Sequence, residues 1–137
     1  DAGVLIHEGQ LTYASQGLVK LLDFGEWWAQ ETDGLPLPLG LDAVRSDLGE
    51  PAAKAIEGAL RASIEHALAH ADEALEYARG FGRGISPDVN RRFVRMYVNQ
   101  DTLRLPPDGV RALTELYRRA HAAGAIPRIP AVTMISP

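Results

Sequence analysis

The chain has 137 residues, of which 46% are hydrophobic, so it can form a compact domain with a core and is not a disordered linker. Its 18 acidic and 14 basic residues are mixed along the sequence and give a formal net charge of -4, which argues against a nucleic-acid-binding surface. The chain has no cysteine, which excludes disulfides and thiolate catalysis.

The sequence also bears on where the protein works. No apolar run approaches the roughly 20 residues that a membrane helix needs, so we expect no membrane contact. A chain without cysteine suits the reducing cytoplasm, and we expect it there. It starts at Asp1 and enters a strand-like run almost at once, so we expect it to be part of a longer protein.

Two short apolar runs near the start predict strands. Residues 2–6 do not alternate with polar residues, as in a parallel strand covered on both faces, and residues 18–22 form a second run. We expect a short helix between them, over residues 8–13, and a longer helix over residues 24–32. This order indicates an α/β fold with few strands, followed by a helical carboxyl-terminal region.

The segment after the second run is rich in aromatic residues and proline. We interpret Trp27 and Trp28 as packing residues, because large aromatic rings commonly anchor a helix to a sheet. The stretch GLPLPLG at residues 34–40 contains two prolines, which cannot donate hydrogen bonds to a sheet. It therefore predicts an edge strand or an extended connection.

Beyond Gly49 the pattern is helical. The spacing of apolar residues predicts helices over residues 50–69, over residues 71–79, from residue 87, and from residue 107 to 124. Ser86 is expected to cap the third of these helices. Its buried side should consist of Val89, Phe93, Met96 and Tyr97.

Two patterns in this part have a structural interpretation that we favour over a catalytic one. The GFGRG stretch at residues 80–84 lacks the Lys-Ser/Thr ending of a phosphate loop, so we interpret Gly80, Gly82 and Gly84 as helix breakers. His66 and His70 have the spacing of a paired metal site but no third ligand, and we interpret them as a solvated or capping pair. No metal site is expected.

His7 and Glu8 stand out because they directly follow the first predicted strand. In open parallel sheets ligands bind just outside the carboxyl ends of the strands. Imidazole is substantially neutral at pH 7 and can accept a proton from a substrate, and Glu8 could orient it. His7 is therefore a candidate general base, with a helix-capping or backbone-bonding role as the alternative.

Several stretches together resemble one enzyme family. They are GVLIHEGQLTY, LVKLLDFGEWWAQETDGLPLPLG, ALAHADEALEYAR and YVNQDTLRL, with a helix ending AAGAIP after the last. In this order they are similar to the carboxyl-terminal half of the 1,4-dihydroxy-6-naphthoate synthase family, from the futalosine route to menaquinone. The related chorismate dehydratase family shares the YVN ending but matches the IHE and GLPLPLG stretches less well.

The resemblance implies a particular architecture. The family has a two-lobed fold like that of type II periplasmic solute-binding proteins, with the active site in the cleft. Residues 1–35 would end one lobe, residues 36–45 would cross the hinge, and residues 46–137 would form the helical part of the other lobe. Pro38, Leu39 and Gly40 would then line the cleft and contact substrate, together with Glu8.

The resemblance also implies an activity. The family converts the small molecule cyclic dehypoxanthinyl futalosine to 1,4-dihydroxy-6-naphthoate and dihydroxyacetone, and a histidine at the place of His7 is taken as the base. This lyase chemistry needs no cofactor, and none is expected here. The main partner would be the amino-terminal half of the same enzyme. Without it we expect an inactive chain that forms a homodimer or aggregate through its uncovered helix faces.

Two alternatives from other classes stay open on the sequence. A solute-binding or effector-sensing module would use the same two-lobed fold without turnover. A secretion signal ahead of the chain would favour that module, and a direct cytosolic start would favour the enzyme. A helical interaction domain is a third alternative, but it leaves His7 and the two strand-like runs unexplained.

Overall fold

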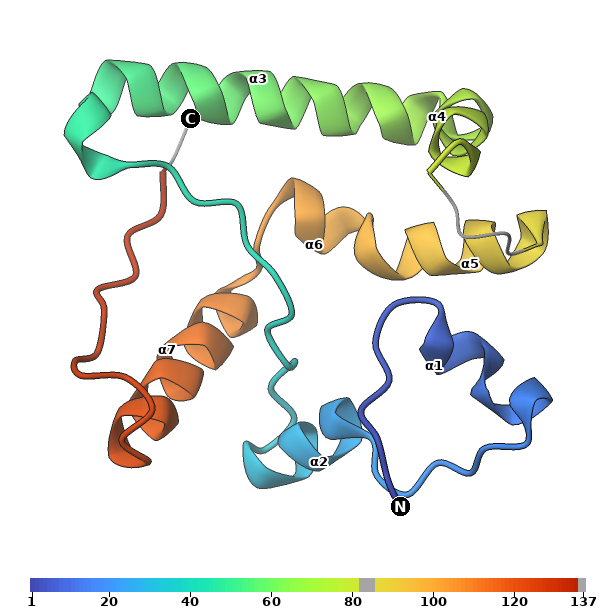
Figure 1. The fold of residues 1–137 in the computed structure, drawn as a ribbon. Helices are drawn as coiled ribbons and strands as arrows, with labels where there is room; N and C mark the ends of the chain where they lie inside the picture. Colours follow the sequence, from blue (N-terminus) through green and yellow to red (C-terminus); the bar gives the residue numbers. More distant parts are fainter. Residues whose placement is uncertain (82–85, 136–137) are drawn as a thin grey trace. The chain divides into compact units, whose positions relative to one another are not determined.

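The computed structural model describes residues 1–81 and 86–135, and helices account for most of them (Figure 1). Contacts within the chain define two compact units. The first consists of Asp1–Leu21 and Ala62–Leu103, and the second of Leu22–Arg61 and Arg104–Pro137. The division at residues 35 and 45 that the sequence suggested stays a prediction. The α-helices are α1 (Gly9–Thr12), α2 (Phe24–Glu31), α3 (Glu50–Ala69), α4 (Ala71–Arg79), α5 (Pro87–Tyr97), α6 (Gln100–Leu103) and α7 (Pro107–Ala122).

The expected α/β fold is wrong, because the described residues contain no β-strand. Residues 2–6 and 18–22, predicted as strands, are irregular coil (Figure 1). A strand is stable only when its backbone groups pair with a neighbouring strand, and among the described residues neither run forms a strand. Their apolar side chains are largely exposed as a result.

The two-lobed periplasmic-binding-protein-like architecture is wrong for the same reason. That fold requires a sheet in each lobe, and residues 1–81 and 86–135 form none. The edge strand considered for residues 34–40 is also coil. The strand prediction failed because a continuous apolar run is not specific to a strand, and these runs are exposed coil in the structure.

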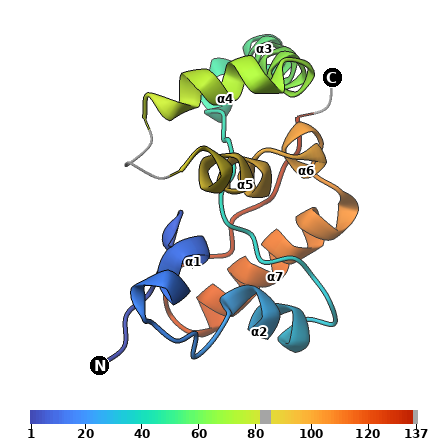
Figure 2. The same cartoon turned by 90° about the vertical axis from the view of Figure 1, so that its right-hand side faces the viewer.

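In the first unit, helices α4 and α5 lie side by side (Figures 1 and 2). An ion pair joins them, since Nη1 of Arg91 donates to Oδ1 of Asp72 at 2.9 Å. Leu75 of α4 and Asn90 of α5 are buried. Ser86 caps α5 as expected, because its Oγ accepts from the Val89 amide at 3.3 Å.

The second unit holds most of the buried apolar side chains. Trp28 of α2 is only 2% exposed, and Ala112 and Leu113 of α7 are also buried. The indole Nε1 of Trp28 donates to the carbonyl oxygen of Pro36 at 3.0 Å, which satisfies its polar group and ties α2 to the segment that follows. The packing interpretation is confirmed for Trp28, whereas Trp27 is exposed.

Helix α3 has the bounds that its apolar spacing predicted, yet it contains no buried residue. Ile56 is 37% exposed and Leu60 is 38% exposed, so the apolar stripe of this helix is only partly covered. On α5 the expected buried side is likewise incomplete, since Met96 and Tyr97 are exposed. None of the described helices combines the length and apolar character needed to cross a membrane.

The glycine-rich stretch agrees with a helix stop as far as it is described. Gly80 follows the last residue of α4 and its amide donates to the Tyr77 carbonyl at 3.2 Å. The other two glycines of this stretch, Gly82 and Gly84, lie outside the described residues.

Candidate functional site

The first apolar run ends in a tight turn at His7 and Glu8. The amide of Gly9 donates to the Ile6 carbonyl at 3.2 Å, which closes a four-residue turn with these two residues in the middle. His7 has a φ of 54°, in the left-handed region. Few residues other than glycine adopt this conformation, although histidine is among those that tolerate it. Such backbone strain is concentrated at functional sites, so the turn is a candidate site on geometric grounds.

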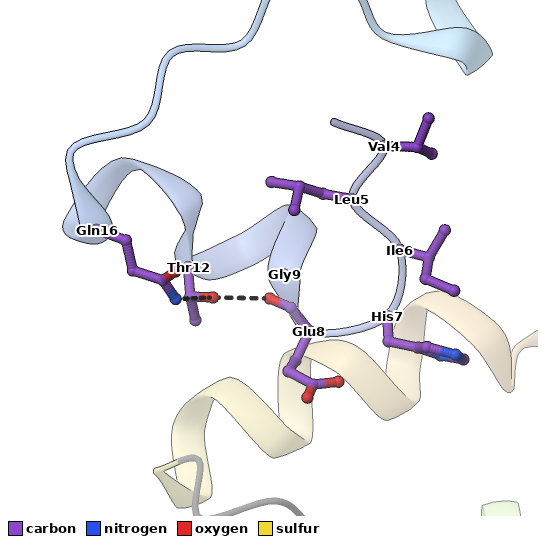
Figure 3. Close-up of a pocket in the computed structure, with 8 residues that line it drawn as sticks. All are labelled: Val4, Leu5, Ile6, His7, Glu8, Gly9, Thr12 and Gln16. Atoms are coloured by element: carbon purple, nitrogen blue, oxygen red, sulfur yellow. Dashed lines mark hydrogen bonds between the residues drawn. The ribbon is translucent and has the colours of Figure 1, made fainter. Parts of the chain in front are cut away.

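The turn forms one wall of an open pocket of about 430 Å³ within the first unit. Figure 3 shows the Leu5 side chain directed into the loop, toward Gly9, while Val4 and Ile6 point out of it. His7 and Glu8 lie next to each other on the rim. The full lining is Val4, Leu5, Ile6, His7, Glu8, Gly9, Thr12 and Gln16.

Helix α1 and the turn after it supply the opposite wall. Oγ1 of Thr12 donates to the Glu8 carbonyl at 3.2 Å, and Nε2 of Gln16 donates to Oγ1 of Thr12 at 3.4 Å (Figure 3). These two hydrogen bonds connect Gln16 and Thr12 to the backbone of Glu8, the residue that follows His7. Polar residues therefore line both walls of the pocket.

The structure places the predicted site residues in two groups. His7 and Glu8 line the same pocket, but no strand precedes them, so the strand-end argument for them is wrong. Pro38, Leu39 and Gly40 belong to the second unit and do not line this pocket. Their role as substrate contacts stays a prediction.

Contacts from α5 to the turn were missed by the sequence reasoning. The rings of His7 and Phe93 meet edge to face, with centroids 6.1 Å apart and planes at 65°. The spacing of Phe93 and Tyr97 placed both on one face of this helix, and the sequence analysis interpreted that face as core. A pairing between segments so far apart in sequence leaves no local pattern.

His66 and His70 behave as a capping pair, as interpreted from the sequence. Their rings stack with centroids 4.1 Å apart, and Nδ1 of His70 donates to the His66 carbonyl at 2.9 Å. That carbonyl, in the last turn of α3, also accepts from the backbone amide of His70 at 2.9 Å. Within residues 1–81 and 86–135, no group of three or more potential ligands could hold a metal ion.

A second open pocket, of about 500 Å³, lies within the second unit beside α7. Charged side chains dominate it, and the ones at its centre pair with each other. Hydrogen bonds from Arg118, and then from Arg119, lower the pKa of Glu115 to about 2. The same two arginines hold both of its carboxylate oxygens at 2.7 Å. Nη1 of Arg119 also lies 3.7 Å from a carboxylate oxygen of Glu31, so the cluster has two positive and two negative charges, and we assign it a structural role.

Comparisons with known proteins agree with the stretches that the sequence singled out. A family model described as menaquinone biosynthesis matches residues 1–122. Two curated relatives are named 1,4-dihydroxy-6-naphthoate synthase. The one from Thermus thermophilus is 44% identical over 90% of this chain. The one from Streptomyces coelicolor is 39% identical over 94% of this chain.

A solved structure is similar as well. The crystal structure of a protein from Archaeoglobus fulgidus matches 92% of this chain with a TM-score of 0.86 and 46% sequence identity. This match covers 47% of that protein. The chain likewise spans about half the length of the curated relatives, 45% of each.

Proposed function

Because the chain belongs to the menaquinone biosynthesis family, we propose that it forms the carboxyl-terminal part of a carbon–carbon lyase. The proposed reaction converts cyclic dehypoxanthinyl futalosine to 1,4-dihydroxy-6-naphthoate and dihydroxyacetone. The observation that carries this proposal is the similarity of nearly the whole chain to two proteins named as the synthase. A cytoplasmic location, expected for a chain without cysteine, is part of the proposal.

His7 is the proposed general base. It lies on the rim of the pocket in a strained left-handed turn, which supports a functional role over simple capping. Histidine is the usual proton acceptor near neutral pH. In this role it takes the proton whose removal starts ring opening and carbon–carbon cleavage.

The other predicted substrate contacts belong to the same proposal. Glu8 lines the pocket beside His7 and could orient the substrate or balance the charge that His7 gains. Pro38, Leu39 and Gly40 are proposed as contacts in the assembled enzyme. The solute-binding alternative depended on the two-lobed fold, and no other observation favours it.

The rest of the active site is proposed to come from the amino-terminal half of the same enzyme. The chain spans 45% of the Thermus thermophilus synthase, so the remaining part of such a protein would have to be supplied. The apolar side chains of residues 2–6 and 18–22 are exposed and suit burial against it. We expect the chain alone to be inactive.

The test combines this chain with the part of the Thermus thermophilus synthase that it does not match. After assembly is confirmed by size-exclusion chromatography, substrate is added and product is measured by mass spectrometry. His7→Asn is the informative variant, because asparagine also tolerates the left-handed backbone of the turn. Loss of activity in this variant therefore reports on the imidazole.

The proposal expects dihydroxynaphthoate from the wild-type assembly and at least about a hundredfold less from His7→Asn, the usual scale of lost general-base catalysis. An assembled complex that binds substrate and yields no product would contradict the lyase proposal. Equal product from the variant would contradict the role of His7.

A further inference from the structure

Helix α5 presents two aromatic side chains to the His7 turn. Phe93 and Tyr97 are four residues apart and so lie on one face of the helix. Their ring centroids are 4.8 Å apart with planes at 49°. Phe93 in turn meets the His7 ring edge to face at 6.1 Å. Tilted and edge-to-face arrangements are the favourable geometries for aromatic pairs.

Tyr97 makes a second connection to the same turn. Nε2 of Gln10, three residues after His7, donates to the Tyr97 hydroxyl oxygen at 3.2 Å. The segment from His7 to Gln10 is therefore attached to α5 at both ends. His7 packs on Phe93, and Gln10 is hydrogen-bonded to Tyr97. All four residues belong to the first unit.

The His7 side chain is exposed and has the Phe93 ring against it. Within residues 1–81 and 86–135 its imidazole makes no hydrogen bond, and its aromatic contact is the edge-to-face one with Phe93. Both ring nitrogens consequently remain available to a ligand. A general base needs this combination of a fixed ring and a free nitrogen, since catalytic rates are sensitive to the placement of reacting groups.

We propose that Phe93 is a positioning residue that sets the orientation of the His7 imidazole for proton abstraction. Tyr97 supports it by packing against Phe93 and by holding the turn through Gln10. The inference rests on the proposed function, because positioning matters only if His7 acts on a substrate. It adds a requirement that the proposed function does not contain: an aromatic ring at residue 93.

The first test is spectroscopic and needs no activity. The 137-residue chain is labelled at its 4 histidines, and the His7 signals are identified by their loss in His7→Asn. The Phe93 ring current should displace the His7 ring protons from their free-histidine positions. Phe93→Leu should abolish the displacement and Phe93→Tyr, which keeps the ring, should preserve it. Unchanged His7 signals in Phe93→Leu would overturn the inference.

The chain offers matched controls in α4 and just after it. Tyr77 and Phe81 form another aromatic pair, with centroids 5.3 Å apart, and both are exposed. Phe81→Leu and Tyr77→Phe make the same chemical changes as Phe93→Leu and Tyr97→Phe without touching the His7 turn. Neither should move the His7 signals, and displacement by these controls equal to that in Phe93→Leu would also overturn the inference.

The second test is kinetic and uses the assembled enzyme. Phe93→Leu should lower kcat about tenfold or more while KM changes less than about twofold, because substrate binding remains and the base is misplaced. Phe93→Tyr should restore kcat. Tyr97→Phe, which loses only the bond to Gln10, should lower kcat less.

The outcomes separate this inference from the proposed function. Normal kcat in Phe93→Leu, together with a lost ring-current shift, would show that the contact exists but does not position the base. No turnover by the wild-type assembly would overturn the proposed function and the positioning role with it, even where the His7 signals reveal the contact.

Discussion

Arg119 of α7 closes the carboxyl end of α2, because its Nη2 donates to the Glu31 carbonyl oxygen at 2.6 Å. The same guanidinium lies over the Trp28 ring, 5.3 Å from its centroid. It also donates from Nε to Glu115 at 2.7 Å. One side chain thus satisfies a helix-terminal carbonyl, covers the most buried aromatic ring and pairs with a carboxylate.

Arg119→Lys should therefore destabilise the chain although the charge is kept. Lysine lacks the planar fork that serves three partners, and the lost bonds predict a decrease of about 1–3 kcal/mol in the free energy of unfolding. Arg118→Lys is the matched control, since Arg118 is exposed and, among the described residues, forms its ion pair with Glu115 alone. Urea unfolding measures both, and equal losses in the two variants would contradict the account.

Two helical glycines should respond to alanine in opposite ways. A Cβ at Gly109 would lie 2.5 Å from Cδ1 and 2.9 Å from Cγ of Leu105, whereas a Cβ at Gly58 would meet no atom within 4 Å. Gly58→Ala should stabilise the chain by about 0.5–1 kcal/mol through helix propensity. Gly109→Ala should destabilise it by about 1–3 kcal/mol through overpacking. Thermal unfolding of both variants measures these changes. A Gly109→Ala variant that is more stable than wild type would contradict the close packing of Leu105 against Gly109.

Stability should fall in acid through Glu115. Its pKa in the folded chain is about 2, below the ordinary value of 4.5, mainly because of hydrogen bonds from Arg118 and then Arg119. The unfolded chain binds the proton more readily, so this contribution is complete above pH 4.5 and is lost as the pH falls toward 2.

Glu115→Gln should flatten the pH dependence of the urea midpoint in that window. Added salt should weaken the dependence in the wild-type chain, because the carboxylate and Arg118 are accessible to solvent. Parallel profiles for the two proteins would show that another group is responsible.

The exposed apolar segment at residues 18–22 should make the isolated chain self-associate. Val19 and Leu21 are each 80% exposed, and such clusters on a lone chain favour association. Light scattering should give a mass above that of one chain. Val19→Lys with Leu21→Lys should lower it, whereas Ala62→Lys with Ser63→Lys adds the same charge on α3 and should not. A strictly monomeric wild-type chain would contradict this prediction.

Helices were predicted from the sequence more reliably than any other element. The bounds of α3 and the Ser86 cap follow from local patterns, since spacing and capping act within a few residues. The runs at residues 2–6 and 18–22 failed because strand formation depends on a partner that the pattern itself does not specify. The short helix α6 gave no periodic signal and was missed.

The candidate site was predictable only in part. His7 and Glu8 were singled out because titratable residues abruptly end an apolar run; both line one pocket, and their roles stay a prediction. The left-handed backbone conformation of His7 could not be predicted from the sequence, because residues other than glycine usually avoid it. The contact with Phe93 joins distant segments, and only the folded chain reveals it.

The most direct test of the central claim is the single-turnover rate of the assembled enzyme at saturating substrate. Wild type is compared with His7→Asn and with His121→Asn, the same substitution near the end of α7. The account predicts a rate at least about a hundredfold lower for His7→Asn and an unchanged rate for His121→Asn. A His7→Asn enzyme that turns over at the wild-type rate would contradict the assignment of His7 as the base.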